Sequence, residues 1–208
     1  MDAIFREIVV WLKKPRSGWI IRDIPNEVAE TVLLHVKKVV RAARIYGRVV
    51  SGLDYERFIK MALYHDFAEY REKDYLPWEI SLEEKHERER VIIEKVRDKL
   101  GRWKEIYDIW MEFEERKSPE ARALYQLDKL DAAVQALEYE KMWFDKVVDF
   151  YPDTQKKLSA PLLIKIFSIL LQRKYPDIAY FEQYLLLLEV AWDEDAFDER
   201  VSQGKIKT

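Results

Sequence analysis

The stretch FIKMALYHDFAEY at residues 58–70 predicts a helix and places polar chemistry on it. Its apolar side chains recur three to four residues apart, at helical spacing: Phe58, Ile59, Ala62, Leu63 and Phe67. An imidazole and a carboxylate, His65 and Asp66, interrupt this pattern. A charge in an apolar setting is costly unless it is paired or binds a metal ion. The stretch therefore indicates a helix of the core that carries part of a candidate metal site.

Glu69 extends this candidate site by one helical turn. It lies four residues after His65 and three after Asp66, so a helix projects all three side chains toward one side. Such a group offers two metal ligands with an acid or base beside them. The alternative is a surface His-Asp pair that occurs by chance, because two-residue motifs are common.

The remainder of the chain keeps the same helical period and indicates an all-α fold. Five glycines and seven prolines interrupt 208 residues, and no alternating pattern typical of strands stands out. Helices are expected at about 2–14, 26–46, 54–69, 81–100, 102–116, 118–150, 160–174 and 177–192. Without a repeat or a linker, we expect one domain over residues 1–208. Its core would span about 10–150, with packing helices in 151–193 and a loose tail in 194–208.

Several residue pairs have the pattern of helix ends. Asn26 and Asp54 are expected N-caps, and Gly47 is an expected stop after the second helix. Ser81 and Glu84 form a capping box, and Ser118-Pro119 is an N-cap followed by proline at the first helical position. Pro152 is expected to end the long helix that begins there.

Composition excludes several classes of protein. The sequence has no cysteine, which rules out disulfides, thiolate catalysis and cysteine-bound metal sites. This fits a reducing compartment, and we expect a cytoplasmic protein. Thirty-six basic and 39 acidic residues leave a net charge of −3, which argues against a general nucleic-acid binder. The basic run at 35–48 is then read as a solvated helix face.

No segment has the pattern of a membrane anchor. The longest apolar run, YLLLLEVAW at 184–192, contains Glu189 and falls short of the roughly 20 residues that a span needs. Residues 1–14 carry early acids and no small-residue cleavage site, so they do not read as a signal peptide. We therefore expect no membrane partner.

A metal centre needs ligands beyond His65 and Asp66, and few residues can supply them. The chain has three histidines; the other two are His35, in ETVLLHVKKV, and His86, in the charged run EEKHERER. His35 lies on an apolar helix, where a satisfied core histidine is the alternative, and His86 fits a solvated charged face. Asp128 lies at the margin of an apolar stripe on a later helix, where a surface ion pair is the alternative.

A histidine, then His-Asp on a later helix, then an aspartate on a still later helix resembles the HD-domain metal-dependent phosphohydrolases. Within that family the chain is similar to the YfbR-type 5′-deoxynucleotidases and their archaeal and eukaryotic relatives. The resemblance covers about residues 10–150 and rests on segments in the right order: GWIIRDIPN, ETVLLHVKKV, ALYHDFAE, EEKHERER, YDIWMEFEERKSPEARALYQLDKLD and QALEYE.

The resemblance implies a role for eight residues. The four protein ligands of one divalent cation would be His35, His65, Asp66 and Asp128. Glu69 matches the catalytic carboxylate of the family, and Asp74 an acid that helps to hold the nucleotide. Trp19 matches an aromatic residue that orients the phosphate, and Arg16 would bind the phosphate beside it.

Five of these assignments have alternatives. Glu69 could instead only hydrogen-bond a metal ligand. One alignment places Thr31 at the first ligand position, whereas the other, which we favour, needs an insertion after Asn26 and uses His35. Arg22 could replace Arg16, because Gly18 precedes the tryptophan here. Trp19 could instead anchor the loop by packing. Asp74 is followed by one more residue before the proline than is usual in the family, which leaves its role open.

The implied activity is hydrolysis of (deoxy)ribonucleoside 5′-monophosphates to nucleoside and phosphate. Two imidazoles and two carboxylates suit Mn, Co, Fe, Ni or Zn. The alternatives are another HD nucleotide phosphohydrolase that cleaves a triphosphate or pyrophosphate bond, or a degenerate HD domain that binds a nucleotide without turnover. Family relatives are commonly dimers, so the apolar C-terminal helices could also form a homodimer interface.

Overall fold

The computed structural model describes residues 10–70, 79–100, 104–191 and 193–204, and it confirms the all-α fold expected from the sequence. Within these residues the one β feature is an isolated bridge between Pro15 and Thr31. The helices are α2 (Ser17–Ile20), α3 (Val32–Val49), α4 (Tyr55–Tyr64), η1 (Phe67–Tyr70), α5 (Leu82–Leu100), α6 (Lys104–Glu115), α7 (Pro119–Lys141), η2 (Asp145–Val147), α8 (Phe150–Lys157), α9 (Pro161–Leu171), α10 (Tyr180–Glu189) and α11 (Glu194–Ser202).

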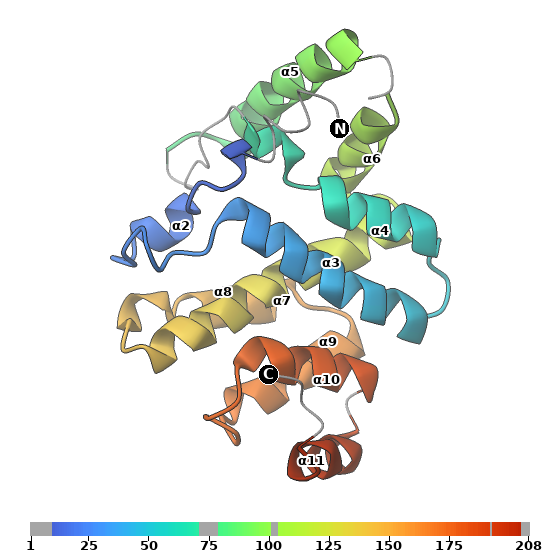
Figure 1. The fold of residues 1–208 in the computed structure, drawn as a ribbon. Coiled ribbons are helices and arrows are strands. Elements are labelled where there is room, and N and C mark those ends of the chain that lie inside the picture. The colour runs from blue at the N-terminus through green and yellow to red at the C-terminus, as the bar shows by residue number, and fades with distance from the viewer. Residues whose placement is uncertain (1–9, 71–78, 101–103, 192, 205–208) are drawn as a thin grey trace.

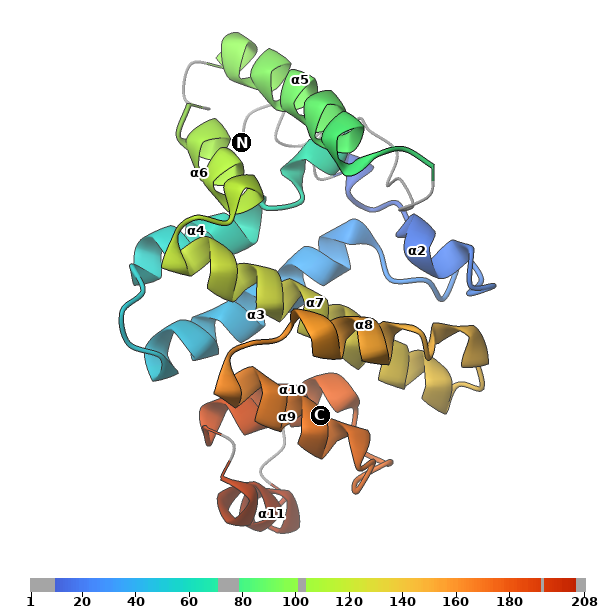
Figure 2. The same cartoon turned by 180° about the vertical axis from the view of Figure 1, so that it is seen from behind.

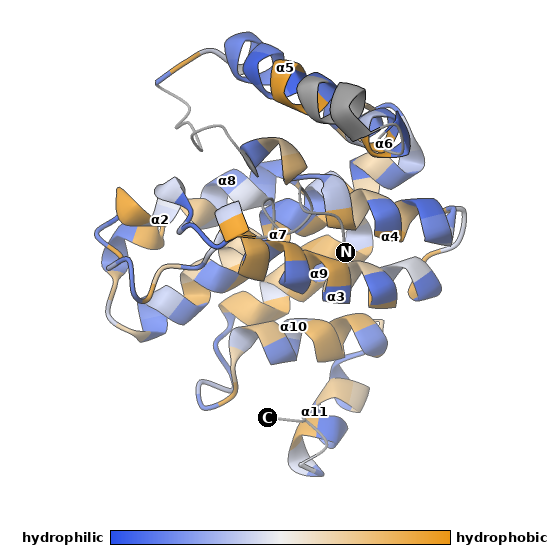
Figure 3. Ribbon diagram, turned by 45° about the horizontal axis from the view of Figure 1, so that its top comes forward, coloured by the Kyte–Doolittle hydropathy of each residue, from blue (hydrophilic) through white to orange (hydrophobic). Residues whose placement is uncertain are grey.

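The helix α7 runs through the middle of the molecule. It contacts α3, α4, α6, α8, α9 and α10, so most of its circumference is covered by other helices. The pair α5 and α6 lies at one end of the molecule and α9, α10 and α11 at the other (Figures 1 and 2). Figure 3 shows that α5 is mostly hydrophilic, whereas hydrophobic residues are more frequent on α10.

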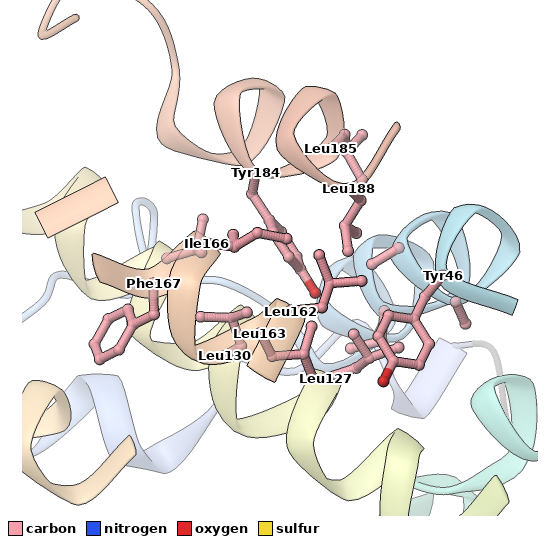
Figure 4. Packing of buried hydrophobic residues seen from close by; sticks show 14 of the residues in the cluster. Tyr46, Leu127, Leu130, Leu162, Leu163, Ile166, Phe167, Tyr184, Leu185 and Leu188 are labelled. Atoms are coloured by element: carbon pink, nitrogen blue, oxygen red, sulfur yellow. The ribbon is translucent and has the colours of Figure 1, made fainter. Parts of the chain in front are cut away.

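The largest hydrophobic cluster joins the central helices to the C-terminal ones. Figure 4 shows part of it: Leu127 and Leu130 of α7 face Leu163 of α9 and Tyr184 of α10, all less than 2% exposed. Burial of a side chain of this size contributes about 1.5–3 kcal/mol. Residues 160–190 are therefore part of the same core as α3 and α4.

The helix α3 begins later than the sequence indicated. Asn26 was expected to cap it, but Thr31 is the N-cap, and its side chain accepts a hydrogen bond from the Leu34 amide at 3.2 Å. Gly47 lies inside the helix and does not end it. A Cβ at Gly47 would lie 3.0 Å from the Tyr55 ring, so glycine here lets α4 begin close to α3.

The expected helix at 54–69 is two elements. Asp54 caps α4 as predicted, by accepting from the Arg57 amide at 3.0 Å, but α4 ends at Tyr64. His65 is its C-cap, and a short 3₁₀ segment, η1, follows. The break changes the direction of the chain at the His-Asp pair, so side chains on either side of it can reach one site.

The expectation that Pro152 ends the long helix is wrong. The long helix α7 starts at Pro119 with Ser118 as N-cap, as predicted, but it ends at Lys141. Trp143 has a positive φ of 70°, and the chain turns there. Pro152 lies in the first turn of a separate helix, α8, where its missing N–H removes no helical hydrogen bond.

Residues 194–202 differ from the loose tail that we expected. They form α11, and the Asp193 side chain caps it by accepting from the Ala196 amide at 3.1 Å. Phe197 is 2% exposed and packs edge-on against Tyr175, with ring centroids 5.7 Å apart. Phe197 and the partly buried Val201 therefore attach this otherwise charged helix to the core. Among the residues described, no helix combines the length and the apolarity that crossing a membrane would demand.

Candidate metal centre

Four side chains, which lie up to 93 positions apart in the sequence, meet where α3, the junction of α4 and η1, and α7 come together (residues 35, 65, 66 and 128). The Nε2 atom of His35 lies 3.1 Å from Asp128 Oδ1 and 3.6 Å from Asp66 Oδ2. The Nε2 atom of His65 lies 3.4 Å from that of His35 and 3.5 Å from Asp66 Oδ2. The structure thus brings ligand atoms of His35, His65 and Asp66 within 4.8 Å of one another, and it places the fourth predicted ligand, Asp128, beside His35.

The tautomers of the two imidazoles follow from their other nitrogens. The Nδ1–H of His65 donates to the Ala62 carbonyl at 2.9 Å, and the Nδ1–H of His35 donates to Asp131 at 2.8 Å. In the neutral rings both Nε2 atoms then present lone pairs, although they face each other at 3.4 Å. Two facing lone pairs beside two carboxylates call for a cation between them.

A buried carboxylate oxygen of Asp66 also indicates a cation site. Asp66 Oδ2 is buried and has no hydrogen-bond partner among the described residues. It lies within 4.8 Å of ligand atoms from both His35 and His65. An unsatisfied buried carboxylate oxygen is costly, and a divalent cation would satisfy it. The donor set of two imidazoles and two carboxylates therefore fits a divalent transition metal.

The electrostatics of the cluster favour ligands that carry negative charge. Burial raises the pKa of Asp128, but Lys129 and the His35 hydrogen bond hold it well below its ordinary value. Burial and Arg16 would lower the pKa of His35, yet hydrogen bonds to Asp128 and Asp131 raise it to about 10. Because a metal ligand must be deprotonated, a cation at this place would replace the proton that these acids attract.

A second group of charges, which was not predicted from the sequence, lies behind the ligands. Asp131 is fully buried; its Oδ2 binds His35, and its Oδ1 lies 3.4 Å from Lys38 Nζ. Lys38 also donates to Glu30 Oε1 at 2.8 Å. Glu30, His35 and Asp131 could themselves be taken for a metal site, but the Lys38 ammonium already supplies a cation there. Helical spacing was the sequence signal that could have indicated this group. Lys38 lies three residues after His35, and Asp131 lies three residues after Asp128, so each shares a helix face with a proposed ligand.

A cavity of about 440 Å³ opens beside the cluster. His65, Asp66 and Asp128 lie in its wall, and so does Glu69, the predicted catalytic carboxylate. Glu69 is 7% exposed, and its backbone carbonyl accepts a hydrogen bond from Lys14 Nζ at 2.8 Å. The wall also carries four cationic side chains: Lys85, Arg116, Lys129 and Lys157. Its size and mixed charge suit a small polar anion.

The third histidine also reaches this cavity, although its sequence context indicated a solvated face. His86 of α5 lies in the cavity wall, and its Nε2 is 2.7 Å from Glu114 Oε2 on α6. Glu89, one turn further along α5, is buried in the same wall, and burial raises its pKa to about 7. The charged run of α5 is thus partly directed inward.

The residues proposed to bind phosphate occupy different positions. The guanidinium of Arg16 is 3.5 Å from Glu30 and near enough to the cluster to affect the pKa values of His35 and Asp66. Trp19 is 1% exposed and packs between Tyr139 and Phe150, with centroids 5.0 and 4.6 Å away. The packing role is therefore the one that its position supports.

The side-chain positions distinguish Arg16 from Arg22 and His35 from Thr31, but they do not test the role of Asp74. Arg22 donates to Asp149 and to the Gly18 carbonyl, which hold it away from the four ligands. Thr31 caps α3, so His35 and not Thr31 lies in the cluster. Asp74, expected to hold the nucleotide, lies outside the residues that the structure describes.

Comparison with known proteins agrees with this site. The HD domain family model matches residues 12–162. The 5′-deoxynucleotidase HDDC2 of Xenopus laevis is 33% identical over 84% of this chain and 88% of its own, and the human protein of that name is 32% identical over 84% and 87%. The solved structure of PH0347 protein from Pyrococcus horikoshii OT3 superposes with a TM-score of 0.61 at 26% identity, covering 88% of this chain and 96% of that one. A helical fold, a His/His-Asp/Asp cluster drawn from three segments and a family match over most of the chain agree, and the chain belongs to the HD-domain family.

Proposed function

We propose that this protein is a metal-dependent 5′-nucleotidase that hydrolyses deoxyribonucleoside 5′-monophosphates to nucleoside and phosphate. The observation that carries the proposal is the convergence of His35, His65, Asp66 and Asp128 beside a cavity whose wall holds the last three of them and Glu69. Relatives about one-third identical over most of the chain carry the name 5′-deoxynucleotidase, which supports the choice of substrate.

Each residue would have a defined task. His35, His65, Asp66 and Asp128 would hold one divalent ion, with Mn, Co, Fe, Ni and Zn as candidates. The ion would supply charge that stabilises the phosphoryl group and would make a nearby water molecule more acidic. Glu69 would accept the proton of the attacking water, since it lies in the same wall as the ligands.

Binding of the phosphate would use Arg16. Arginine presents a planar fork of N–H donors that matches phosphate oxygens, and 19% of the Arg16 side chain is exposed. Asp74 would contribute to holding the nucleotide near the ion, as the resemblance implies. Trp19 would act indirectly, by anchoring the loop that carries Arg16.

The first experiment measures inorganic phosphate released from dAMP, dTMP, AMP and dATP. The protein is treated with chelator and then supplied separately with Mn²⁺, Co²⁺, Fe²⁺, Ni²⁺, Zn²⁺ or Mg²⁺. We expect release from the monophosphates with a transition metal and none with chelator alone. No release with any ion would refute the proposal; triphosphate released from dATP would favour the alternative of a triphosphohydrolase, and pyrophosphate that of a nucleotide pyrophosphatase.

We also propose one domain, a cytoplasmic location, no membrane or nucleic-acid partner, and a homodimer. The shared core of α3, α4, α7, α9 and α10 supports one domain, and the absence of cysteine supports a reducing compartment.

Exposed apolar side chains offer surfaces for self-association: Trp11, Leu34, Met142 and Trp143 are 50%, 48%, 55% and 94% exposed. Sedimentation equilibrium at micromolar concentration would separate monomer from dimer.

A further inference from the structure

We propose that Glu30 is a positioning residue that ties the phosphate-binding loop to the metal centre, with one carboxylate oxygen for each. This inference rests on the proposed function, because it assigns Arg16 to the phosphate. Glu30 precedes the cap of α3, and its side chain is 1% exposed. A carboxylate buried to that degree needs partners, and it has them on two sides.

The backbone of Glu30 is held first. Its N–H donates to the Tyr139 hydroxyl of α7 at 2.7 Å, and its carbonyl accepts from the Arg16 amide at 2.9 Å. The residue is thereby attached both to the central helix and to the segment that leads into α2. Its side chain starts from a fixed point, so the positions of its two oxygens are defined.

The first oxygen leads to a proposed metal ligand. Glu30 Oε1 accepts from Lys38 at 2.8 Å, Lys38 lies 3.4 Å from Asp131, and Asp131 accepts from His35 Nδ1–H at 2.8 Å. A carboxylate on the far nitrogen of a metal-binding histidine orients the ring and raises its basicity. Lys38 shares its charge between Glu30 and Asp131, so a change at Glu30 alters how strongly Asp131 holds His35.

The second oxygen leads to the loop. Glu30 Oε2 accepts from Trp19 Nε1 at 3.4 Å and lies 3.5 Å from Arg16 Nη1. The Arg16 guanidinium and the Trp19 indole are therefore held by the same carboxylate whose first oxygen supports the His35 side of the cluster from behind. A single carboxylate sets the loop and the metal ligand relative to each other.

The substitution Glu30→Gln separates this role from simple burial. An amide can keep an oxygen toward Lys38, but its NH₂ group then faces the Trp19 N–H and the Arg16 guanidinium, which are donors too. The loop loses its acceptor, and Lys38 shifts its charge toward Asp131. We expect the Kd for inorganic phosphate and the KM for dAMP to rise about tenfold. The Kd for Mn²⁺ is expected to rise at least about threefold.

Two further variants give the contrast. Trp19→Phe keeps an aromatic side chain but lacks the indole N–H, so it removes one donor to Oε2, and we expect a rise of about threefold in the phosphate Kd and an unchanged Mn²⁺ Kd. Glu27→Gln removes the same charge from an exposed position three residues away and is expected to change neither. If Glu30→Gln proves unfolded by circular dichroism, Glu30→Asp keeps the charge, shortens the reach and is expected to shift both constants in the same direction.

The measurements are equilibrium dialysis for Mn²⁺ and titration calorimetry for inorganic phosphate on the Mn²⁺-loaded protein, together with kcat and KM for dAMP. If Glu30→Gln or its aspartate substitute leaves both Kd values within twofold of Glu27→Gln, the inference is wrong. If Trp19→Phe weakens Mn²⁺ as much as Glu30→Gln does, the two oxygens have no separate roles. A wild type that binds both ligands and hydrolyses nothing would refute the proposed function alone, because the two Kd values still decide the role of Glu30.

Discussion

The helix α7 presents two kinds of interior along one length. On one side, Asp128 and Asp131 meet His35 and Lys38 of α3 in a buried network of charges. On the other, Leu127 and Leu130 pack into the apolar cluster with α9 and α10 (Figure 4). The side chains are completely or almost completely buried on both sides. Ion pairs and hydrogen bonds stabilise the first side, and burial of apolar surface stabilises the second.

The two sides of α7 therefore differ in which substitutions they tolerate. An apolar contact is non-directional, so another residue of similar volume can replace Leu127 at small cost. A buried ion is held by particular partners, and removal of one leaves the other uncompensated. Stability on the α3 side of α7 therefore depends on particular residue pairs, whereas stability on the α9 side depends mainly on the apolar volume that is buried. Four substitutions test this contrast, from the largest expected effect to the smallest.

Asp66→Asn is expected to have the largest effect. It removes a charged ligand and leaves an amide near the two imidazoles, so Mn²⁺ affinity and nucleotidase activity should each fall more than about 100-fold. The matched control is Asp195→Asn, at an exposed position on α11. Equal metal content of the two variants after dialysis would contradict the assignment of Asp66 as a ligand.

Lys38→Met is expected to destabilise the fold most. Methionine has a similar length but no charge, so Glu30 and Asp131 would remain buried without the ammonium between them. We expect the free energy of unfolding to fall by about 3–5 kcal/mol, measured by urea denaturation at pH 7. A loss below 1 kcal/mol would mean that water or rearrangement satisfies the two acids at little cost.

Glu89→Gln tests the charged wall of the cavity through pH. Burial raises the pKa of Glu89 from 4.5 to about 7. The folded state therefore favours the protonated acid, whose stabilising contribution is complete below about pH 4.5 and lost as the pH rises through 7. The glutamine variant should be more stable than wild type at pH 8, by up to about 3 kcal/mol, and the gain should disappear near pH 5. Thermal unfolding at both values measures it, and an equal gain at both would exclude titration of Glu89 as the cause.

Leu127→Met completes the comparison, because it introduces the same residue as Lys38→Met but within the apolar cluster that α7 forms with α9 and α10. Leu127 is fully buried among apolar side chains, and methionine conserves its volume. We expect a loss below about 1.5 kcal/mol in the same urea experiment. Similar losses for the two methionine variants would mean that the two sides do not differ as argued above.

The local rules of the sequence predicted much of the fold. Helical periodicity and the caps Asp54 and Ser118 placed α4 and α7, and they did so because capping depends on residues three positions apart. The same rules misplaced both ends of α3 and the ends of α4 and α7. Those boundaries depend on contacts between elements, such as the approach of the Tyr55 ring to Gly47.

The sequence by itself determined the helical class, the absence of thiol chemistry, the family resemblance and the residue types able to bind a metal ion. Tertiary structure alone decided that His35 and not Thr31 enters the cluster, that Trp19 is buried, and that Asp131, Lys38 and Glu30 stand behind the ligands. The physical reason is the separation along the sequence over which each kind of interaction acts. Helix formation and capping act over a few residues, whereas the pairing of His35 with Asp131, 96 positions away, exists only when packing excludes water and brings two helices into contact.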